Sequence, residues 1–305
     1  MRRLILASLV PAFIFSPILG CASDGGDSDS AAENGDGDGD GDPTTGDGDG
    51  DGDGDGDGDL PVLANIDGLI TDQNGDPLAA PGVQFCGPIS ESGFVEACLP
   101  VPVEADGSFA IEVKKLGEWN LKAVHGPEEG RYFTGQAISL TVAEDDAISF
   151  EAPPIAVPEV NTVVDLSAAA GSESFDIAEG QLTLTFDPAN TQTTSFAPAT
   201  ELEAARVDEA LWMPGETLQD KTIVAAWTLH PFGTKMQEGM GSFGLAINDG
   251  VGLAAGEAVE VYEIEKDTAR AHLVATGVVA ADAASLELTE AGEGLHEISW
   301  LYVVQ

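Results

Sequence analysis

The chain has 305 residues, of which 43% are hydrophobic and 6% aromatic, and its formal net charge is −43. Residues 24–59 hold 15 acidic residues and no basic ones, whereas residues 60–305 hold 39 acidic and nine basic residues. The part that can fold is therefore acidic in its own right. This excludes nucleic acid as a partner, because binding phosphate requires clustered lysine and arginine.

The N-terminus, residues 1–20, has the pattern of an export signal. Two arginines follow Met1, and the apolar run from Leu4 to Leu19 is interrupted by prolines. This run is shorter than the ~20 apolar residues that span a membrane, so we expect a cleaved signal peptide.

Ile18–Cys21 resembles a bacterial lipobox, in which a small residue precedes the modified cysteine. The resemblance implies that Cys21 carries a diacylglycerol and an amide-linked fatty acid such as palmitate, which together anchor a protein stably to a membrane. Residue 22 is alanine rather than aspartate, which implies delivery to the outer membrane or cell surface. The alternative is an ordinary signal peptide with a chance cysteine.

Residues 21–59 are dominated by Gly-Asp alternation. Dense like charge without apolar groups predicts a disordered tether, about 30–36 Å long for its 36 acidic-tract residues. A calcium loop of the EF-hand type needs glutamate at its twelfth position, where this repeat places glycine. We therefore expect weak calcium association and no folded metal site. Similar tracts follow the lipobox in myxobacterial surface proteins, which this chain resembles.

Residues 60–160 are expected to form a first β domain. Residues 65–78 read as strand, turn and strand around Asn74-Gly75, and apolar or alternating runs follow at 83–86, 98–103, 109–113 and 119–124. The stretch GLITDQNGDPL at Gly68–Leu78 and the stretch DGSF at Asp106–Phe109 resemble the carboxypeptidase regulatory-like family. That resemblance implies a prealbumin-like β-sandwich, in which Asp72 and Asp106 hydrogen-bond turn amides.

Cys86 and Cys98 form an even pair in a chain that is expected to be exported, which predicts a disulfide. On the chain-entropy model such a bridge contributes about 3 kcal/mol.

Residues 161–174 are rich in alanine and serine and are interpreted as a linker, and residues 175–305 as a second β-sandwich. Short strand patterns recur there at 180–186, 223–229, 244–247, 259–264, 271–279 and 298–303. The expected fold class is thus all-β, with two sandwiches behind a signal peptide and a disordered linker.

Catalytic, metal and cofactor sites are not expected. The sequence H-x-x-E at His125–Glu128, with His230 downstream, resembles metallocarboxypeptidase ligands, but the catalytic α/β domain of those enzymes has no counterpart here. The glycine-rich segment Gly239–Gly244 precedes a strand pattern, unlike a dinucleotide-binding turn. The four tryptophans (Trp119, Trp212, Trp227 and Trp300) are interpreted mainly as core rather than as a carbohydrate platform.

These patterns favour a lipid-anchored surface lipoprotein that acts as a non-enzymatic binding or structural module. Its expected partners are the membrane, through the lipid, and a glycan or cell-surface protein. Two alternatives remain: an accessory domain of a hydrolytic system or cryptic zinc hydrolase, and a calcium-stabilised adhesin.

Overall fold

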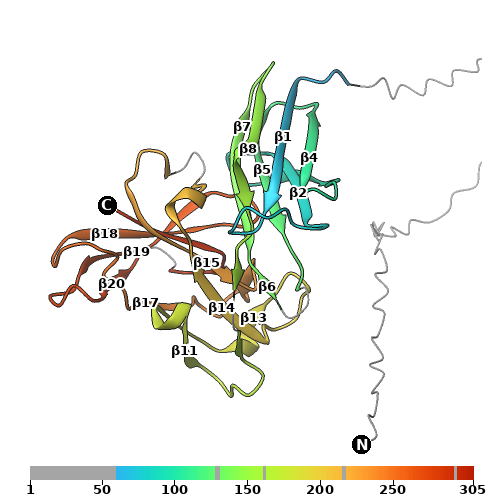
Figure 1. The fold of residues 1–305 in the computed structure, drawn as a ribbon. Coiled ribbons are helices and arrows are strands. Elements are labelled where there is room, and N and C mark those ends of the chain that lie inside the picture. Colours follow the sequence, from blue (N-terminus) through green and yellow to red (C-terminus); the bar gives the residue numbers. More distant parts are fainter. Residues whose placement is uncertain (1–59, 128–130, 161–162, 215–217, 292–293) are drawn as a thin grey trace, which may run out of the picture. The chain divides into compact units, whose positions relative to one another are not determined.

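A computed structural model describes residues 60–127, 131–160, 163–214, 218–291 and 294–305 (Figure 1). The signal peptide, Cys21 and the Gly-Asp tract lie outside the described residues. The described chain is all-β, with three short 3₁₀ helices at Ala178–Gly180, Pro188–Asn190 and Glu209–Leu211. Residues Gly56–Gln305 cluster as a single unit by their contacts.

The first β-sandwich has two facing sheets, with strand orders β4-β1-β8 and β3-β2-β5-β7. A short two-stranded sheet pairs β6 with β9. The strands are β1 (Ala64–Thr71), β2 (Gly82–Ile89), β3 (Val95–Val101), β4 (Ser108–Val113), β5 (Gly117–Val124), β6 (Tyr132–Phe133), β7 (Gly135–Val142), β8 (Ala147–Ala156) and β9 (Glu159–Val160).

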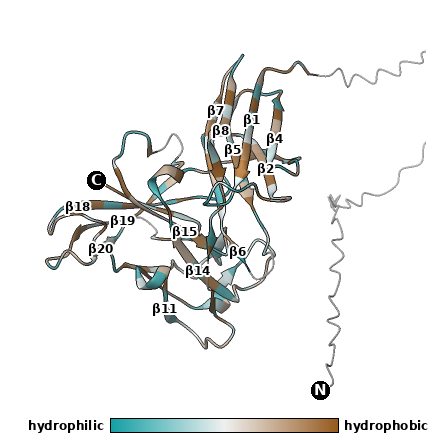
Figure 2. Ribbon diagram, viewed as in Figure 1, coloured by the Kyte–Doolittle hydropathy of each residue, from teal (hydrophilic) through white to brown (hydrophobic). Residues whose placement is uncertain are grey.

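Alternating side chains of these strands build the first core. Phe109 and Val113 of β4 point inward, as the period of two in that strand predicts. Phe85 and Trp119 stack at the centre with their ring centroids 4.1 Å apart. Hydrophobic and hydrophilic residues interleave along the strands, as expected for sheets with one covered face (Figure 2).

The second β-sandwich is built on a seven-stranded sheet, β10-β14-β15-β22-β18-β19-β20, with two three-stranded sheets, β11-β12-β17 and β13-β16-β21. Its strands are β10 (Val164–Asp165), β11 (Glu173–Ile177), β12 (Leu182–Phe186), β13 (Thr191–Gln192), β14 (Glu201–Arg206), β15 (Ile223–His230), β16 (Thr234–Met236), β17 (Gly244–Ile247), β18 (Ala258–Ile264), β19 (Ala271–Val279), β20 (Leu286–Glu290), β21 (Glu297–Ile298) and β22 (Trp300–Val304).

Strand β22 shows that the large sheet is covered on both faces. All five of its residues are buried. Leu301 and Val303 belong to the core of the second sandwich, whereas Trp300, Tyr302 and Val304 belong to a separate cluster that includes Ala137 of β7. Because successive side chains of a strand point to opposite faces, this second cluster packs the two sandwiches against each other.

Polar contacts reinforce the junction between the sandwiches. Trp300 Nε1 donates to the backbone oxygen of Gly135 at 2.6 Å, and His230 Nδ1 lies 2.8 Å from the backbone oxygen of Phe133. The segment expected to be a linker contributes strand β10, and Leu166 lies in the second core. The domain boundaries themselves stay a prediction.

Candidate functional site

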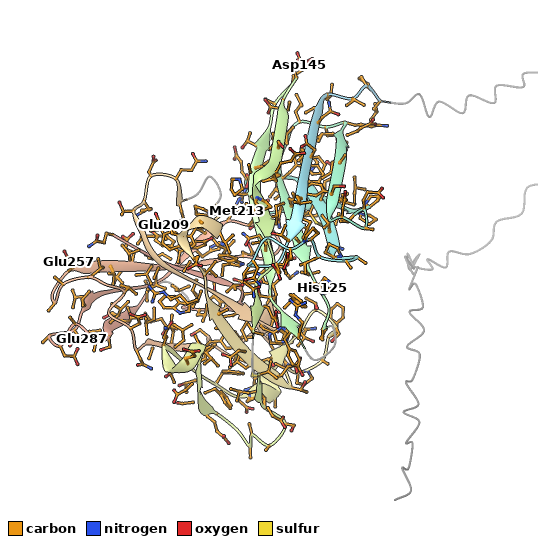
Figure 3. All side chains as sticks on the ribbon, in the orientation of Figure 1. His125, Asp145, Glu209, Met213, Glu257 and Glu287 are labelled. Carbon is orange, nitrogen blue, oxygen red and sulfur yellow. A yellow bond between two sulfur atoms is a disulfide. The ribbon has the colours of Figure 1, made fainter. Side chains whose placement is uncertain are left out.

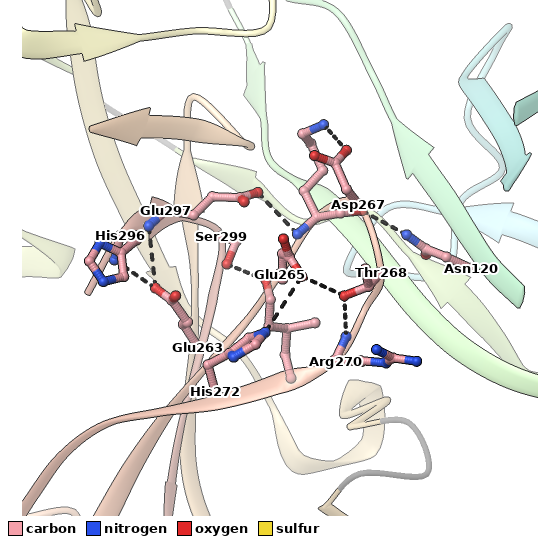
Figure 4. A network of polar contacts seen from close by, with 12 residues as sticks. Asn120, Glu263, Glu265, Asp267, Thr268, Arg270, His272, His296, Glu297 and Ser299 are labelled. Carbon is pink, nitrogen blue, oxygen red and sulfur yellow. Dashed lines mark hydrogen bonds and ion pairs between the residues drawn. The ribbon is translucent and has the colours of Figure 1, made fainter. Parts of the chain in front are cut away.

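A polar cleft of about 510 Å³ opens on the second β-sandwich. Strands β16, β18 and β19 and the segment leading into β21 supply its walls. Most of its lining side chains are ionisable: Lys235, Glu263, Glu265, His272, His296 and Glu297. Figure 4 shows how several of them form one polar network with the β18–β19 connection.

Two carboxyls of the cleft are almost completely buried. Glu263 is 4% exposed and Glu297 is 2% exposed. Glu263 Oε2 accepts hydrogen bonds from the backbone N–H groups of His296, at 3.0 Å, and Glu297, at 3.3 Å. The Lys266 N–H donates to Glu297 Oε1 at 3.0 Å. Burial disfavours the charged form and raises the pKa of both carboxyls to about 7.

Lys235 forms the positive centre of the cleft. Its Nζ lies 2.9 Å from Asp267 Oδ2, 3.2 Å from Glu297 Oε2 and 3.9 Å from Glu265 Oε1. Burial alone would lower the pKa of Lys235, but the negative charges of Glu297 and Asp267 outweigh it and raise that pKa. Burial likewise opposes ionisation of Asp267, yet hydrogen bonds from Lys266 and Lys235 hold its pKa below the usual range.

Glu265 is held in its ionised form by different neighbours. Thr268 Oγ1 donates to Glu265 Oε2 at 2.6 Å, and His272 Nε2 lies 3.5 Å from the same oxygen. The contact with His272 is the main reason that the pKa of Glu265 falls to about 2. In return, Glu265 raises the pKa of His272.

The connection between β18 and β19 is clamped to the first sandwich. Asn120 Nδ2 donates to the Lys266 backbone oxygen at 2.7 Å. Arg270 makes a bidentate pair with Glu118, at 2.9 and 2.8 Å, and its guanidinium also donates to the Ser90 backbone oxygen. Bidentate arginine–carboxylate pairs fix orientation, so one wall of the cleft is held in place by the neighbouring domain.

This arrangement has two chemical capacities. Fixed donors and acceptors in an open cleft suit the binding of a small polar ligand. In addition, Glu263, whose pKa is raised, and Glu265, whose pKa is lowered, line the same cleft. Two carboxyls whose environments separate their pKa values form the pattern used in general acid–base chemistry.

The disulfide predicted between Cys86 and Cys98 is confirmed. The two residues face each other across the antiparallel strands β2 and β3. The predicted roles of two aspartates are confirmed as well. Asp72 Oδ1 accepts from the N–H groups of Asn74 and Asp76, and Asp106 Oδ1 accepts from the N–H of Ser108.

The histidines that resemble zinc ligands are engaged elsewhere. His125 Nδ1 and Nε2 lie 2.6 and 2.9 Å from the backbone oxygens of Gly126 and Ala79 (Figure 3). His230 Nε2 lies 3.1 Å from Glu201 Oε1. Glu128 lies outside the described residues. Within the described ranges, no three His, Cys, Asp or Glu side chains are grouped as a metal site requires.

The acidic cluster at 144–146 lies in the turn that connects β7 of one sheet to β8 of the other, where Figure 3 labels Asp145. Asp146 Oδ2 accepts a hydrogen bond from the Ala143 N–H. Trp119, Trp227 and Trp300 are core residues, at 5%, 0% and 1% exposure, as their strand positions predict.

The sequence reasoning missed the cleft, although one signal was readable. Val259, Val261 and Glu263 have the same parity along β18, and the two valines lie in the core. A glutamate that continues an inward-facing row of valines must be buried. Nothing in the linear pattern indicates that Lys235 and Glu297, from β16 and β21, join it.

Comparison with known proteins identifies no family. No family model matches the chain, and no curated protein does. The solved structures similar to it include a DUF3823 family protein from Bacteroides ovatus, at 12% identity and a TM-score of 0.20 over 78% of this chain and 81% of that one. Another DUF3823 family protein, from Parabacteroides merdae, has 10% identity and a TM-score of 0.22 over 76% and 97%.

A candidate carbohydrate-binding protein from Bacteroides uniformis is similar at 7% identity and a TM-score of 0.24, over 80% of this chain and 100% of that one. TM-scores this low carry no argument about function. The resemblance of Gly68–Leu78 to the carboxypeptidase regulatory-like family stays a prediction. Among the described residues, no helix is both long enough and apolar enough to cross a bilayer.

Proposed function

We propose that this protein is a lipid-anchored surface lipoprotein that binds a polar extracellular ligand, a glycan or a group on a cell-surface protein, without transforming it. The observation that carries the binding role is the cleft around Lys235. Its carboxylates are each held by a cation or by backbone amides, so its donors and acceptors are already oriented before a ligand arrives. Such preorganisation lowers the entropic cost of binding.

The export and anchoring parts of the proposal rest on Met1–Cys21. The Cys86–Cys98 disulfide supports them, because disulfides persist in oxidising compartments outside the cytosol. The Gly-Asp tract would then separate the folded body from the membrane surface, and its dense like charge would keep it extended.

Metabolic labelling with a palmitate analogue tests the anchor. We expect label in the wild-type chain and in Ser23→Ala, and its loss in Cys21→Ala. Label that persists in Cys21→Ala contradicts the lipidation site. Protease treatment of intact cells then tests display, because an exposed folded body is digested without lysis.

Titration of the purified full chain with isolated oligosaccharides tests the binding role. We expect His272→Ala, at an exposed wall of the cleft, to weaken the binding of any ligand found. His125→Ala, outside the cleft, is the control and should leave affinity unchanged. A chain that binds no member of the panel contradicts the glycan part of the proposal.

Hydrolysis is a second candidate function, favoured by Glu263 and Glu265 in one cleft. Incubation of the chain with the same oligosaccharides, followed by measurement of new reducing ends, distinguishes the two functions. Turnover by the wild type that disappears in Glu263→Gln would establish an enzyme and overturn the binding-only proposal.

A further inference from the structure

Phe196 is displayed in an unusual way beside the cleft. Its side chain is 84% exposed, and its backbone is left-handed, with φ of +62°. The tight turn that imposes this conformation is closed by hydrogen bonds from the Phe196 N–H to the Thr193 oxygen, at 2.9 Å, and from the Thr193 N–H to the Ala197 oxygen, at 2.8 Å. A bulky side chain in the left-handed backbone conformation costs free energy that glycine would avoid, so the stability of the fold does not explain why position 196 is a phenylalanine.

Phe196 is also one of the residues that line a second pocket, of about 250 Å³. Besides Phe196, its lining residues are polar, charged or glycine: Gln192, Thr193, Thr194, Gly233, Lys235, Lys266 and Asp267. An aromatic anchor of a protein interface normally sits within an apolar core, which this surface lacks. The setting of Phe196 therefore favours a ligand that is itself both flat and polar.

Asp267 is contacted by three lysines on the polar side of this pocket. Lys235 Nζ lies 2.9 Å from Asp267 Oδ2, Lys122 Nζ lies 3.4 Å from Oδ1, and Lys266 Nζ hydrogen-bonds Oδ1 as well. The stem of Lys266 passes close over Gly233, where a Cβ would stand 2.2 Å from Lys266 Cδ. The carboxylate and the ammonium groups thus present acceptors and donors at fixed positions next to an aromatic face.

Lys235 lines both this pocket and the larger cleft, so the two hollows adjoin at its side chain. A linear ligand could therefore contact Phe196 at one end and the carboxyls around Glu263 at the other. Pyranose rings match this combination: one face carries C–H groups that cover an aromatic ring, and the rim carries hydroxyls that both donate and accept hydrogen bonds.

We propose that the Phe196 pocket is a subsite for a neutral pyranose ring, which stacks on Phe196 and hydrogen-bonds to Asp267 and Lys266, and that a linear oligosaccharide continues past Lys235 into the cleft. This inference rests on the proposed binding function and specifies its ligand class. The ammonium groups here are offset by Asp267 and, at Lys235, by Glu297 and Glu265 as well, which favours a neutral sugar over an acidic one.

The test is calorimetric titration of the full chain with linear hexaoses of glucose, mannose, xylose and N-acetylglucosamine, and with an oligogalacturonate as the acidic probe. We expect a neutral hexaose to bind, and Phe196→Ala to weaken it by about tenfold, the factor that corresponds to one lost aromatic contact. Phe196→Trp should retain binding. Phe94→Ala, which removes a second exposed phenylalanine, is the matched control and should bind as the wild type does.

Phe196→Gly separates binding from folding. Glycine accepts the left-handed backbone, so this variant should melt at or above the wild-type temperature and still lose affinity. Unchanged affinity in Phe196→Ala, with loss confined to His272→Ala, overturns this subsite and leaves the proposed binding function standing. Binding of the acidic probe alone overturns the neutral-sugar assignment. Binding of no probe overturns the pyranose subsite together with the glycan part of the proposed function.

Discussion

Replacing Glu263 with glutamine should make the stability of the protein less sensitive to pH. The pKa of this carboxyl is raised from 4.5 to about 7 by burial, so the folded state holds a proton that the unfolded chain releases between these values. Stability therefore falls as pH rises from about 4.5 to about 7, by ~1.4 kcal/mol per pH unit for one proton, or about 3 kcal/mol in all. Glutamine cannot ionise, and its side-chain oxygen can still accept from the N–H groups of His296 and Glu297.

The assay is urea unfolding followed by tryptophan fluorescence, because Trp227 and Trp300 are buried in the fold. The useful quantity is the difference in unfolding free energy between Glu263→Gln and the wild type, measured at each pH. Any effect of the glutamine that does not depend on pH shifts this difference equally at every pH, so it leaves the change of the difference with pH unaltered. This difference should shift in favour of the variant by about 3 kcal/mol between about pH 4.5 and about pH 8.

Glu265→Gln is the matched control, two residues away. The pKa of Glu265 is lowered to about 2, so its contribution is present above about pH 4.5 and is lost as pH falls through about 2. Its difference from the wild type should change in acid, stay level between about pH 5 and about pH 6, and change again at higher pH, because the variant no longer raises the pKa of His272. A level difference for Glu263→Gln across the same range would refute the reasoning about burial.

Two further perturbations concern the framework. Replacing both Cys86 and Cys98 with alanine should cost about 3 kcal/mol of unfolding free energy, and a reducing agent should lower the urea midpoint of the wild type but not that of the double variant; equal midpoints would show that the bridge adds no stability. Gly135→Ala should cost about 1–3 kcal/mol in thermal or urea unfolding, because its Cβ would lie 2.3 Å from the Phe232 ring at the junction between the sandwiches. Gly126→Ala, with open space around it, is the control, and an equal effect of both substitutions would contradict the packing argument.

Strand prediction succeeded where one face of a strand is buried and the other is exposed to solvent. Residues 109–113 alternate clearly, and they form β4. Strand β14 was missed, because half of the residues of Glu201–Arg206 are charged and only Leu202 and Ala204 point into the core. Strand β7 was also missed, since seven of its eight residues are buried and no alternation marks it. Strand β8 was missed although Ile148 and Phe150 alternate with exposed residues.

The candidate site was largely invisible for a different reason. Glu263, Lys235 and Glu297 come from three strands separated along the chain, and each looks like an ordinary surface charge in its own segment. Phe196 follows Thr-Thr-Ser in a polar stretch, and only the turn geometry shows that its ring stands out from the surface beside a pocket. The tryptophans, which the sequence analysis interpreted mainly as core, are core residues at positions 119, 227 and 300.

The sequence by itself determined the all-β class, the turn roles of Asp72 and Asp106 and the cysteine pair. These features depend on alternation, on glycine and aspartate at turns, and on the count of cysteines, all of which act over a few residues or need no partner position. The sequence also supports the export signal and the lipidated Cys21, which stay predictions. Only the tertiary structure decided that the large sheet is covered on both faces, and that Lys235, Glu263, Asp267 and Glu297 share one cleft next to Phe196. Long-range strand pairing and the packing of two sandwiches choose those neighbours, and no local pattern encodes them.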